Sequence, residues 1–376
     1  MRYPYSKTSV SPVVHQHGVT LIELMVGIVI GLLAVLVISQ TMAFSEAQKR
    51  STTSGADAQV NGTLSLYTLE RDLKEAGYGL TAVNSSLGCE IRSSYKGTAS
   101  SFTLAPVVIT AGASGAPDTV RVLGSNKDNF SVPALIVKDH PANAANFFVN
   151  SGVGIADGDF MLAVPETPDA SNWCSLFQVT DSKSGSGPGL GNNQVLHNSG
   201  QSDWNNPGGS TIFPAGGYNT GSYLLNLGAI INRSYSISAG LNLQLSTFSS
   251  ASGAVTTQDL FPNIVQLQAF YGKDTNADGA VDTYDKVTPT TQAGWTQILT
   301  VRIGIVARST QFERDIVTQS SPQWDVGTAM SVSGAVDCGA SKCVSIKIDN
   351  LPDWQRYRYK VYETTVPLRN MLWRST

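Results

Sequence analysis

The sequence is poor in the residue types that most enzymes need. Only 14% of its 376 residues are charged and four are histidines, and it contains no H-E-x-x-H, G-x-S-x-G or Walker phosphate-binding motif. Only His140 and His197 lie beyond the first 18 residues, and neither has a recognisable catalytic setting. We therefore expect a structural protein and not an enzyme.

A basic excess is missing as well. The chain holds 25 Lys and Arg residues against 28 Asp and Glu residues, a formal net charge of −3. Residues 1–18 contain Arg2 and Lys7 and no acid, so the rest of the chain has 23 basic and 28 acidic residues, or −5. This balance argues against a nucleic-acid footprint over the chain as a whole. Low charge with abundant Gly, Ser, Thr and Asn is typical of an extracytoplasmic, β-rich protein.

Cysteine is scarce, with four residues in the whole chain. In an exported protein Cys89, Cys174, Cys338 and Cys343 fit two disulfides, and four cysteines allow three connectivities. If Cys338 and Cys343 close a local loop, Cys89 and Cys174 join distant segments. A zinc site is the alternative, but there is no C-x-x-C pair and few histidines are available as ligands.

One long apolar run stands out near the N-terminus. Residues 24–45 contain no charged side chain, which is long enough for a helix to cross a ~30 Å hydrocarbon layer. Glu23 lies at the start of this run, where a carboxylate is costly in lipid and marks a functional site that needs a partner. The alternatives are an ordinary membrane anchor with a stray acid and a secretory signal peptide, for which the run is too long and no A-x-A site follows.

The residues before the run resemble the processing site of type IV prepilins and type II secretion pseudopilins. A basic leader ends in Gly18 and is followed by V-T-L-I-E and the apolar helix. The resemblance implies that prepilin peptidase cuts between Gly18 and Val19 and that Val19 is N-methylated, although many relatives begin with Phe. Glu23 is then an assembly residue, because the freed amine of Val19 on a neighbouring subunit can stabilise its carboxylate.

The helical pattern continues beyond the apolar run. Apolar residues at spacings of three and four predict one buried helix face. They are Val60, Leu64, Leu66, Leu69, Leu73 and Ala76. Gly77 is the expected C-terminal cap residue, so we predict one helix over 19–76 and divide the chain into a leader (1–18), a helical segment (19–78, with 19–44 as membrane span or filament core) and a head (79–376).

The head reads as a set of short strands separated by turn residues. The predicted strands are 101–108, 119–123, 159–164, 176–180, 222–237, 241–248, 264–271, 296–308, 344–348 and 357–366. Residues 181–222 are rich in Gly, Ser, Asn and Pro and are predicted to be a flexible loop. The expected fold class is α+β and pilin-like, with a long N-terminal helix packed on a β-rich head.

Basic residues alternate over 356–360. Arg356, Arg358 and Lys360 fall on one face of the predicted strand, which makes a docking surface or simply a solvated strand face.

Three further segments are similar to the PilW minor pilins of type IV pili. They are R-D-L-K-E-A-G-Y-G at 71–79, V-R-I-G-I-V-A-R-S at 301–309 and V-P-L-R-N at 366–370. The resemblance implies a low-copy structural subunit at or near the pilus tip that helps to initiate assembly. Its implied partners are other minor pilins, the major pilin, prepilin peptidase, an inner-membrane assembly platform and a tip adhesin.

The resemblance also implies a location. The chain would be a single-pass inner-membrane protein with its head in the periplasm before assembly, and part of an extracellular pilus afterwards. Two alternatives stay open: a GspJ-type minor pseudopilin of a type II secretion system, and an adhesive tip subunit whose residues 181–222 contact a surface.

A second motif lies between two predicted strands. Residues 274–285 fit the twelve-residue calcium loop D-x-[DN]-x-[DN]-G-x5-[DE], with oxygen ligands at alternate positions. The proposed ligands are Asp274, Asn276, Asp278, Asp282 and Asp285, with the carbonyl of Ala280. Asp stands where Glu is usual at the last position and no helix follows, so we expect a calcium loop between strands and not an EF-hand. The alternative is an acidic turn without metal.

Overall fold

The computed structural model describes residues 18–127, 132–180, 193–205, 212–328 and 331–372. The chain divides into two compact units, residues 1–53 and residues 54–376, which are described separately. We refer to the second unit as the head from here on. It includes the end of the N-terminal helix in addition to the predicted head, 79–376.

Helix α1 (Leu21–Glu75) supplies the described secondary structure of the first unit. Its segment Leu21–Glu46 has a mean hydropathy of 3.0 and none of it is buried, so its length and composition suit a membrane span. The predicted helix over 19–76 is confirmed within two residues at each end. In the head, α1 ends at Glu75, and Gly77 just beyond it has a φ of 79° and donates its N–H to the carbonyl of Leu123 at 2.8 Å.

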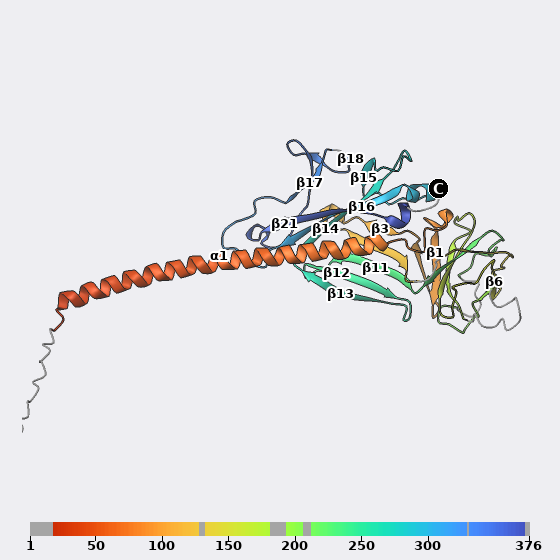
Figure 1. The fold of residues 1–376 in the computed structure, drawn as a ribbon, viewed down its shortest axis with the longest axis horizontal. Coiled ribbons are helices and arrows are strands. Elements are labelled where there is room, and N and C mark those ends of the chain that lie inside the picture. The colour runs from red at the N-terminus through yellow and green to blue at the C-terminus, as the bar shows by residue number, and fades with distance from the viewer. Residues whose placement is uncertain (1–17, 128–131, 181–192, 206–211, 329–330, 373–376) are drawn as a thin grey trace, which may run out of the picture. The chain divides into compact units, whose positions relative to one another are not determined.

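A five-stranded antiparallel sheet lies along the head portion of α1 (Figure 1). In spatial order its strands are β13 (Ala254–Pro262), β12 (Asn242–Ser249), β11 (Ile230–Ile237), β4 (Thr119–Ser125) and β3 (Val107–Thr110). A second five-stranded sheet contains the longest strands of the head. Its order is β18 (Ser331–Val332), β15 (Thr283–Asp285), β14 (Ile264–Lys273), β16 (Ile298–Arg308) and β21 (Tyr359–Pro367).

These two sheets and α1 share one core. The helix contributes Ala58, Leu69, Leu73 and Ala76, and β16 contributes Val301, Ile303 and Ile305 from one face. The strand predicted over 296–308 is confirmed, and these three residues share one face because one face of a strand carries every second residue. Tyr235 of β11 and Tyr271 of β14 lie in the same cluster.

The buried face of α1 agrees with the predicted one at Leu69, Leu73 and Ala76 but differs earlier in the helix. Val60 and Leu64 were expected to be buried and are 55% and 44% exposed. The helix instead presents small residues such as Ala58 and Ser65 to the head. At Gly62 a Cβ would lie 2.3 Å from the ring of Tyr362, so small residues here allow the backbone to approach β21.

A six-stranded sheet forms the rest of the large β structure. Its order is β2 (Thr98–Thr103), β1 (Glu90–Tyr95), β8 (Cys174–Gln178), β7 (Phe160–Val164), β10 (Tyr223–Gly228) and β5 (Ala134–Leu135). Strands β1 and β8 are parallel and are joined by the Cys89–Cys174 disulfide, with Cα atoms 5.9 Å apart. The two faces of this sheet pack into separate hydrophobic clusters.

Smaller elements complete the described part of the head. They are the sheet of β17 (Gln323–Gly327), β20 (Lys342–Ser345) and β19 (Val336–Asp337), the pair β6 (Asn146–Phe148) and β9 (Gln194–Leu196), the helices α2 (Gln292–Thr296) and α3 (Arg369–Leu372), and the 3-10 turns η1 (Asn84–Ser86), η2 (Ala113–Gly115) and η3 (Trp354–Arg356). The Cys338–Cys343 disulfide, with Cα atoms 5.7 Å apart, links β20 to the segment after β19.

The predicted flexible loop over 181–222 differs from the structure where it is described. Strand β9 lies in this stretch, and Trp204, Phe213 and Tyr218 are buried. Residues 181–192 and 206–211 lie outside the described residues, so the prediction is not addressed there. The prediction followed the high content of Gly and Asn. It did not take into account the aromatic side chains of this stretch, which pack against the six-stranded sheet.

Candidate assembly site

The predicted cleavage junction lies in non-helical backbone just before α1. Gly18 and Val19 are exposed, and no described atom lies within 4 Å of a Cβ built on Gly18. The helix begins only at Leu21. No described residue therefore covers the scissile bond predicted between Gly18 and Val19. Residues 1–17 of the predicted leader lie outside the described part of the chain.

Thr20 and Glu23 form a capping box at the start of α1. The backbone N–H and the hydroxyl of Thr20 donate to Oε2 of Glu23 at 2.9 and 3.0 Å, and the N–H of Glu23 donates to Oγ1 of Thr20 at 3.3 Å. This reciprocal arrangement satisfies backbone donors that a helix start leaves free. The T-x-x-E spacing of Thr20 and Glu23 is the sequence signal of this capping box, and it gives Glu23 a partner within its own chain.

At its other end, α1 is fixed to the head by a buried carboxylate. Asp72 is 3% exposed and accepts hydrogen bonds from Nη1 of Arg233 at 2.9 Å and from the hydroxyl of Tyr235 at 2.6 Å. Burial, together with the neighbouring Asp72 carboxylate, raises the pKa of Tyr235, so the phenol stays protonated and donates. Both partners come from β11, so this cluster connects the last turns of α1 to the sheet.

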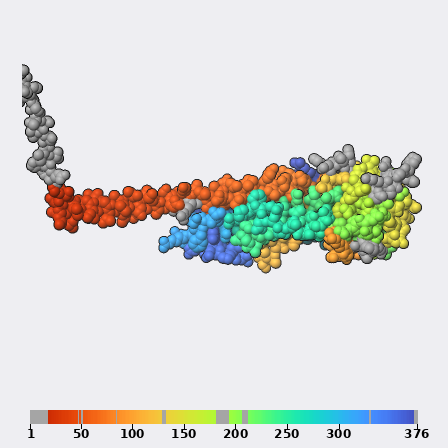
Figure 2. Space-filling model, turned by 90° about the horizontal axis from the view of Figure 1, so that it is seen from below, coloured from red at the N-terminus to blue at the C-terminus, as the bar shows by residue number. Residues whose placement is uncertain are grey.

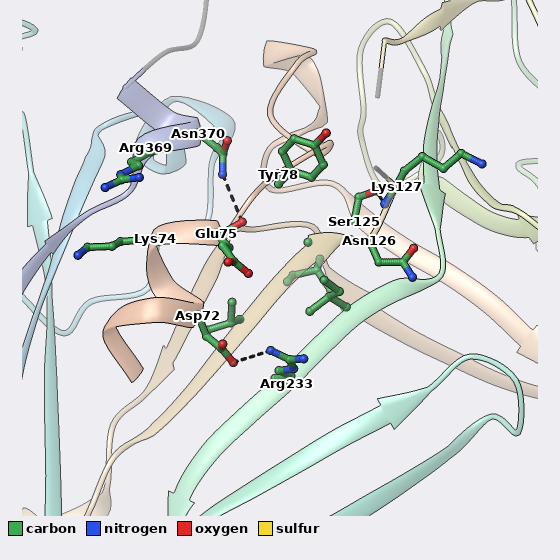
Figure 3. Close-up of a pocket in the computed structure, with 14 residues that line it drawn as sticks. Asp72, Lys74, Glu75, Tyr78, Ser125, Asn126, Lys127, Arg233, Arg369 and Asn370 are labelled. Atoms are coloured by element: carbon green, nitrogen blue, oxygen red, sulfur yellow. Dashed lines mark hydrogen bonds and ion pairs between the residues drawn. The ribbon is translucent and has the colours of Figure 1, made fainter. Parts of the chain in front are cut away.

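A groove of about 520 Å³ surrounds this cluster (Figure 3). It is bounded by the end of α1, by β4 and β11, and by α3. Figure 3 shows Asn370 reaching the end of α1, where its side-chain amide donates to the carbonyls of Glu75 and Ala76 at 3.2 and 2.9 Å. The side chains of Asp72, Arg233 and Asn370 therefore make hydrogen bonds within the head. The groove lies where the end of α1 is attached to the sheet, and these contacts are structural.

The three segments that resemble PilW are in contact in the structure. The first, 71–79, holds Asp72 and the end of α1, which Asn370 of the third segment caps. The second, 301–309, lies in β16, where Val301 pairs with Val366 of β21. The segments therefore form one continuous support for the helix, although they are far apart in the sequence.

The predicted calcium ligands lie on the turn between β14 and β15, but they do not surround one point. The carboxylate of Asp274 accepts the N–H groups of Ala277 and Gly279 at 2.6 and 2.8 Å. Asp285 pairs with Nζ of Lys273 at 2.6 Å. Among the described residues no group of three or more His, Cys, Asp or Glu side chains is arranged to hold a metal.

The other predicted ligands make hydrogen bonds within the same turn. Asn276 donates from its amide to Asp278 and Asp282 at 3.1 and 3.3 Å, and the N–H of Ala280 donates to Asp278 at 2.8 Å. Hydrogen bonds from the Thr275 side chain and backbone lower the pKa of Asp282. As arranged here the residues do not fit a calcium ion, so calcium binding stays a prediction.

The cysteines and histidines take structural roles. All four cysteines are in the two disulfides described above, so they are not free to bind zinc. His140 and His197 have no recognisable catalytic setting in the sequence. In the head their Nε2 atoms lie 2.9 Å apart. Phe147 stacks on His140 with ring centroids 3.6 Å apart.

Burial sets the protonation of this histidine pair. His140 and His197 are 2% and 5% exposed. Burial lowers the pKa of His140 to about 4. Burial is also the main cause that lowers the pKa of His197 to about 3, and electrostatic repulsion from His140 is the second cause. Both rings are therefore neutral near pH 7, with one Nε2 donating and the other accepting.

Comparisons with known proteins match two separate parts of the chain. Residues 234–370 match the family model of type IV pilus-assembly protein W, and residues 14–39 match the prokaryotic N-terminal methylation motif. No curated protein matches the chain significantly. Among solved structures the chain is similar to a type IV-like pilin, TTHA1219, from Thermus thermophilus, with a TM-score of 0.31 and 8% identity over 84% of this chain and 97% of that one.

Proposed function

We propose that the chain, which matches the PilW family model over residues 234–370 and the N-terminal methylation motif over residues 14–39, is a structural minor pilin that enters a type IV pilus at or near the tip and helps to initiate assembly. The observation that carries this proposal is the N-terminal segment. An accessible Gly18–Val19 junction within the matched methylation motif is followed by an apolar helix whose side chains are all exposed over Leu21–Glu46. Such a helix needs an apolar environment, first the membrane and then the core of a filament.

The proposed pathway uses the partners that this family implies. Prepilin peptidase removes the leader, the inner-membrane platform extracts the helix, and other minor pilins and the major pilin receive it. Before assembly the chain is a single-pass inner-membrane protein with its head in the periplasm, and afterwards it is part of the extracellular pilus. The disulfides Cys89–Cys174 and Cys338–Cys343 support this proposal, because disulfides persist in an oxidising compartment.

The test is a deletion of the gene with quantification of surface filaments. We expect far fewer pili in the deletion strain, and recovery with the wild-type chain. In sheared pili the chain should be present at a small fraction of the major pilin, measured by quantitative mass spectrometry. Unchanged piliation, or a defect in protein secretion with normal pili, would contradict the proposal and favour a pseudopilin role.

A further inference from the structure

A patch of exposed apolar and basic side chains lies on the loop after β16. It consists of the loop 309–318 and the segment 355–360 that it packs against, and we refer to it as the basic–aromatic patch. Within it Phe312 and Ile316 are 45% and 56% exposed. The two segments contain four basic and two acidic residues, in a chain that is acidic overall.

The patch is rigidly held by backbone hydrogen bonds. The N–H of Glu313 donates to the carbonyl of Arg356 at 2.8 Å, and the N–H groups of Val317 and Thr318 donate to the carbonyl of Gln355 at 2.9 and 3.0 Å. The ring of Phe312 lies edge-on to Tyr357. Since the loop is fixed in this way, its exposed side chains form a preformed surface.

Aromatic and guanidinium groups alternate across this surface. The guanidinium of Arg356 lies over the ring of Phe312 at 5.6 Å, and that of Arg308 lies over Tyr357 at 4.2 Å. The Arg358 side chain is 57% exposed and pairs with Glu313. Arg314 is exposed between Phe312 and Ile316. In Figure 2 the blue residues from this late part of the chain lie at one end of the head's surface.

The chain itself limits how far this patch can be from the membrane. The N–H of Gln311 donates to Oγ of Ser54 at 3.0 Å, which fixes the loop to the first residue of the head. Ser54 follows the end of the apolar span, Glu46, by eight residues. Eight residues cover about 12 Å as a helix and at most about 28 Å when extended, so the chain length limits the distance between Ser54 and the end of the apolar span to about 28 Å.

We propose that the basic–aromatic patch docks the head on the surface of the inner membrane before assembly, by binding anionic phospholipid headgroups. Arginine guanidinium groups bind phosphate oxygens, and aromatic and aliphatic side chains beside them enter the interfacial region. The sequence also has a basic pair, Lys49–Arg50, just after the span. The proposal rests on the inner-membrane location given above and concerns the state before the chain enters a pilus.

The test uses the full chain in lipid nanodiscs. One set of discs contains phosphatidylcholine alone, and the other contains about one third phosphatidylglycerol, so the span is embedded in both and only the surface charge differs. We expect hydrogen–deuterium exchange of residues 309–318 to be several-fold slower in the phosphatidylglycerol discs. Equal exchange in both discs would overturn the proposal.

A variant pair makes the test specific. Phe312→Ser with Arg314→Glu should remove the lipid-dependent protection, and Arg314→Gln alone should lower the equilibrium constant for docking about fivefold, which corresponds to ~1 kcal/mol for one basic residue at an anionic surface. Val137→Ser with Lys138→Glu changes an exposed apolar and an exposed basic residue elsewhere on the head and should leave the protection intact. Melting temperatures confirm that each variant is folded.

The remaining outcomes separate this proposal from the proposed function. A wild-type chain that fails to enter the discs contradicts the membrane anchor itself. A chain that enters, but whose loop is protected only after another minor pilin is added, assigns the patch to a protein partner and overturns lipid docking.

Discussion

At the residue scale, one substitution can separate the observed capping role of Glu23 from its proposed assembly role. Its Oε2 atom completes the capping box with Thr20, and the family resemblance assigns its charge to the Val19 amine of an adjacent subunit. Gln preserves a capping oxygen but carries no charge. We therefore expect Glu23→Gln and Glu23→Ala both to be processed, and both to enter pili poorly, because an unpaired amine in an apolar core costs several kcal/mol.

The measurement is the ratio of each variant in sheared pili to the same variant in membranes. Thr20→Ala is the matched control, because it removes the capping hydroxyl and retains the carboxylate. If Glu23→Gln enters pili at the wild-type level while Glu23→Ala does not, the capping box and not the charge is what assembly requires.

The histidine pair makes the stability of the head depend on pH. The folded pKa values of His140 and His197, about 4 and about 3, lie below the usual value of 6.5. Above pH 6.5 both rings are neutral in the folded and unfolded states, so this stability is fully present. As pH falls from 6.5 towards 4 only the unfolded chain gains protons, and the folded state loses on the order of 2 kcal/mol per histidine by pH 5.

Urea unfolding of the full chain in detergent at pH 7 and pH 5 measures this effect. The double variant His140→Phe with His197→Leu should have a smaller difference between the two pH values than the wild-type chain. An equal difference in the two proteins would show that carboxylates, and not this pair, cause the acid sensitivity.

At the scale of elements, regular apolar patterns predicted the fold well. The helix and the strands β4, β14 and β16 occur where the sequence placed them, because one face of each is buried and the pattern records that face. Strand β13 was missed, since most of its side chains are exposed and polar residues occupy its middle, so no apolar alternation marks a buried face. The phase of α1 beyond residue 54 was partly wrong for the opposite reason: its contact face uses Ala58, Gly62 and Ser65, which a search for large apolar residues passes over.

The candidate site likewise has features that the sequence predicted and features that it did not. Local signals predicted the cleavage junction, which stays a prediction, and singled out the cysteines, which form two disulfides. The contacts around Asp72, in contrast, depend on β11 and α3, which are distant in the sequence. The pairing of His140 with His197 likewise arises only when β9 and its neighbours fold onto the six-stranded sheet. No spacing rule within one segment could reveal these contacts.

The turn between β14 and β15 gives a prediction at the scale of one element. For calcium to bind at residues 274–285, Asp285 must leave Lys273 and the carboxylates must turn towards one ion. With a Kd in the ~10⁻⁴ to 10⁻³ M range typical of extracellular modules, a tenfold excess of calcium would stabilise the folded chain by about 1.4 kcal/mol. We expect a corresponding rise in melting temperature with calcium but not with magnesium.

The choice of variant follows from the hydrogen bonds of the turn. Asp274 accepts backbone N–H groups and its loss would weaken the turn without any metal, so Asp278→Ala is the better test. It should abolish the calcium-dependent rise, while Asp337→Ala, an exposed acid on β19, should retain it. No heat of binding and no thermal shift at several millimolar calcium would reduce the motif to an acidic turn.

At the scale of the whole molecule, the predicted cleavage between Gly18 and Val19 is the step on which entry into a pilus depends in our proposal. With residues 1–18 attached, Val19 has no free amine, so the charge partner proposed for Glu23 does not exist and the helix start carries a basic leader. We expect Gly18→Val to leave a full-length chain in the membrane and none in sheared pili, because a branched side chain replaces an unobstructed glycine beside the scissile bond. The measurement is the intact mass of the chain in each fraction. Val19→Phe, which matches the residue common in relatives, should be processed normally, and a mature mass for Gly18→Val would remove the cleavage assignment and leave α1 as a plain membrane anchor.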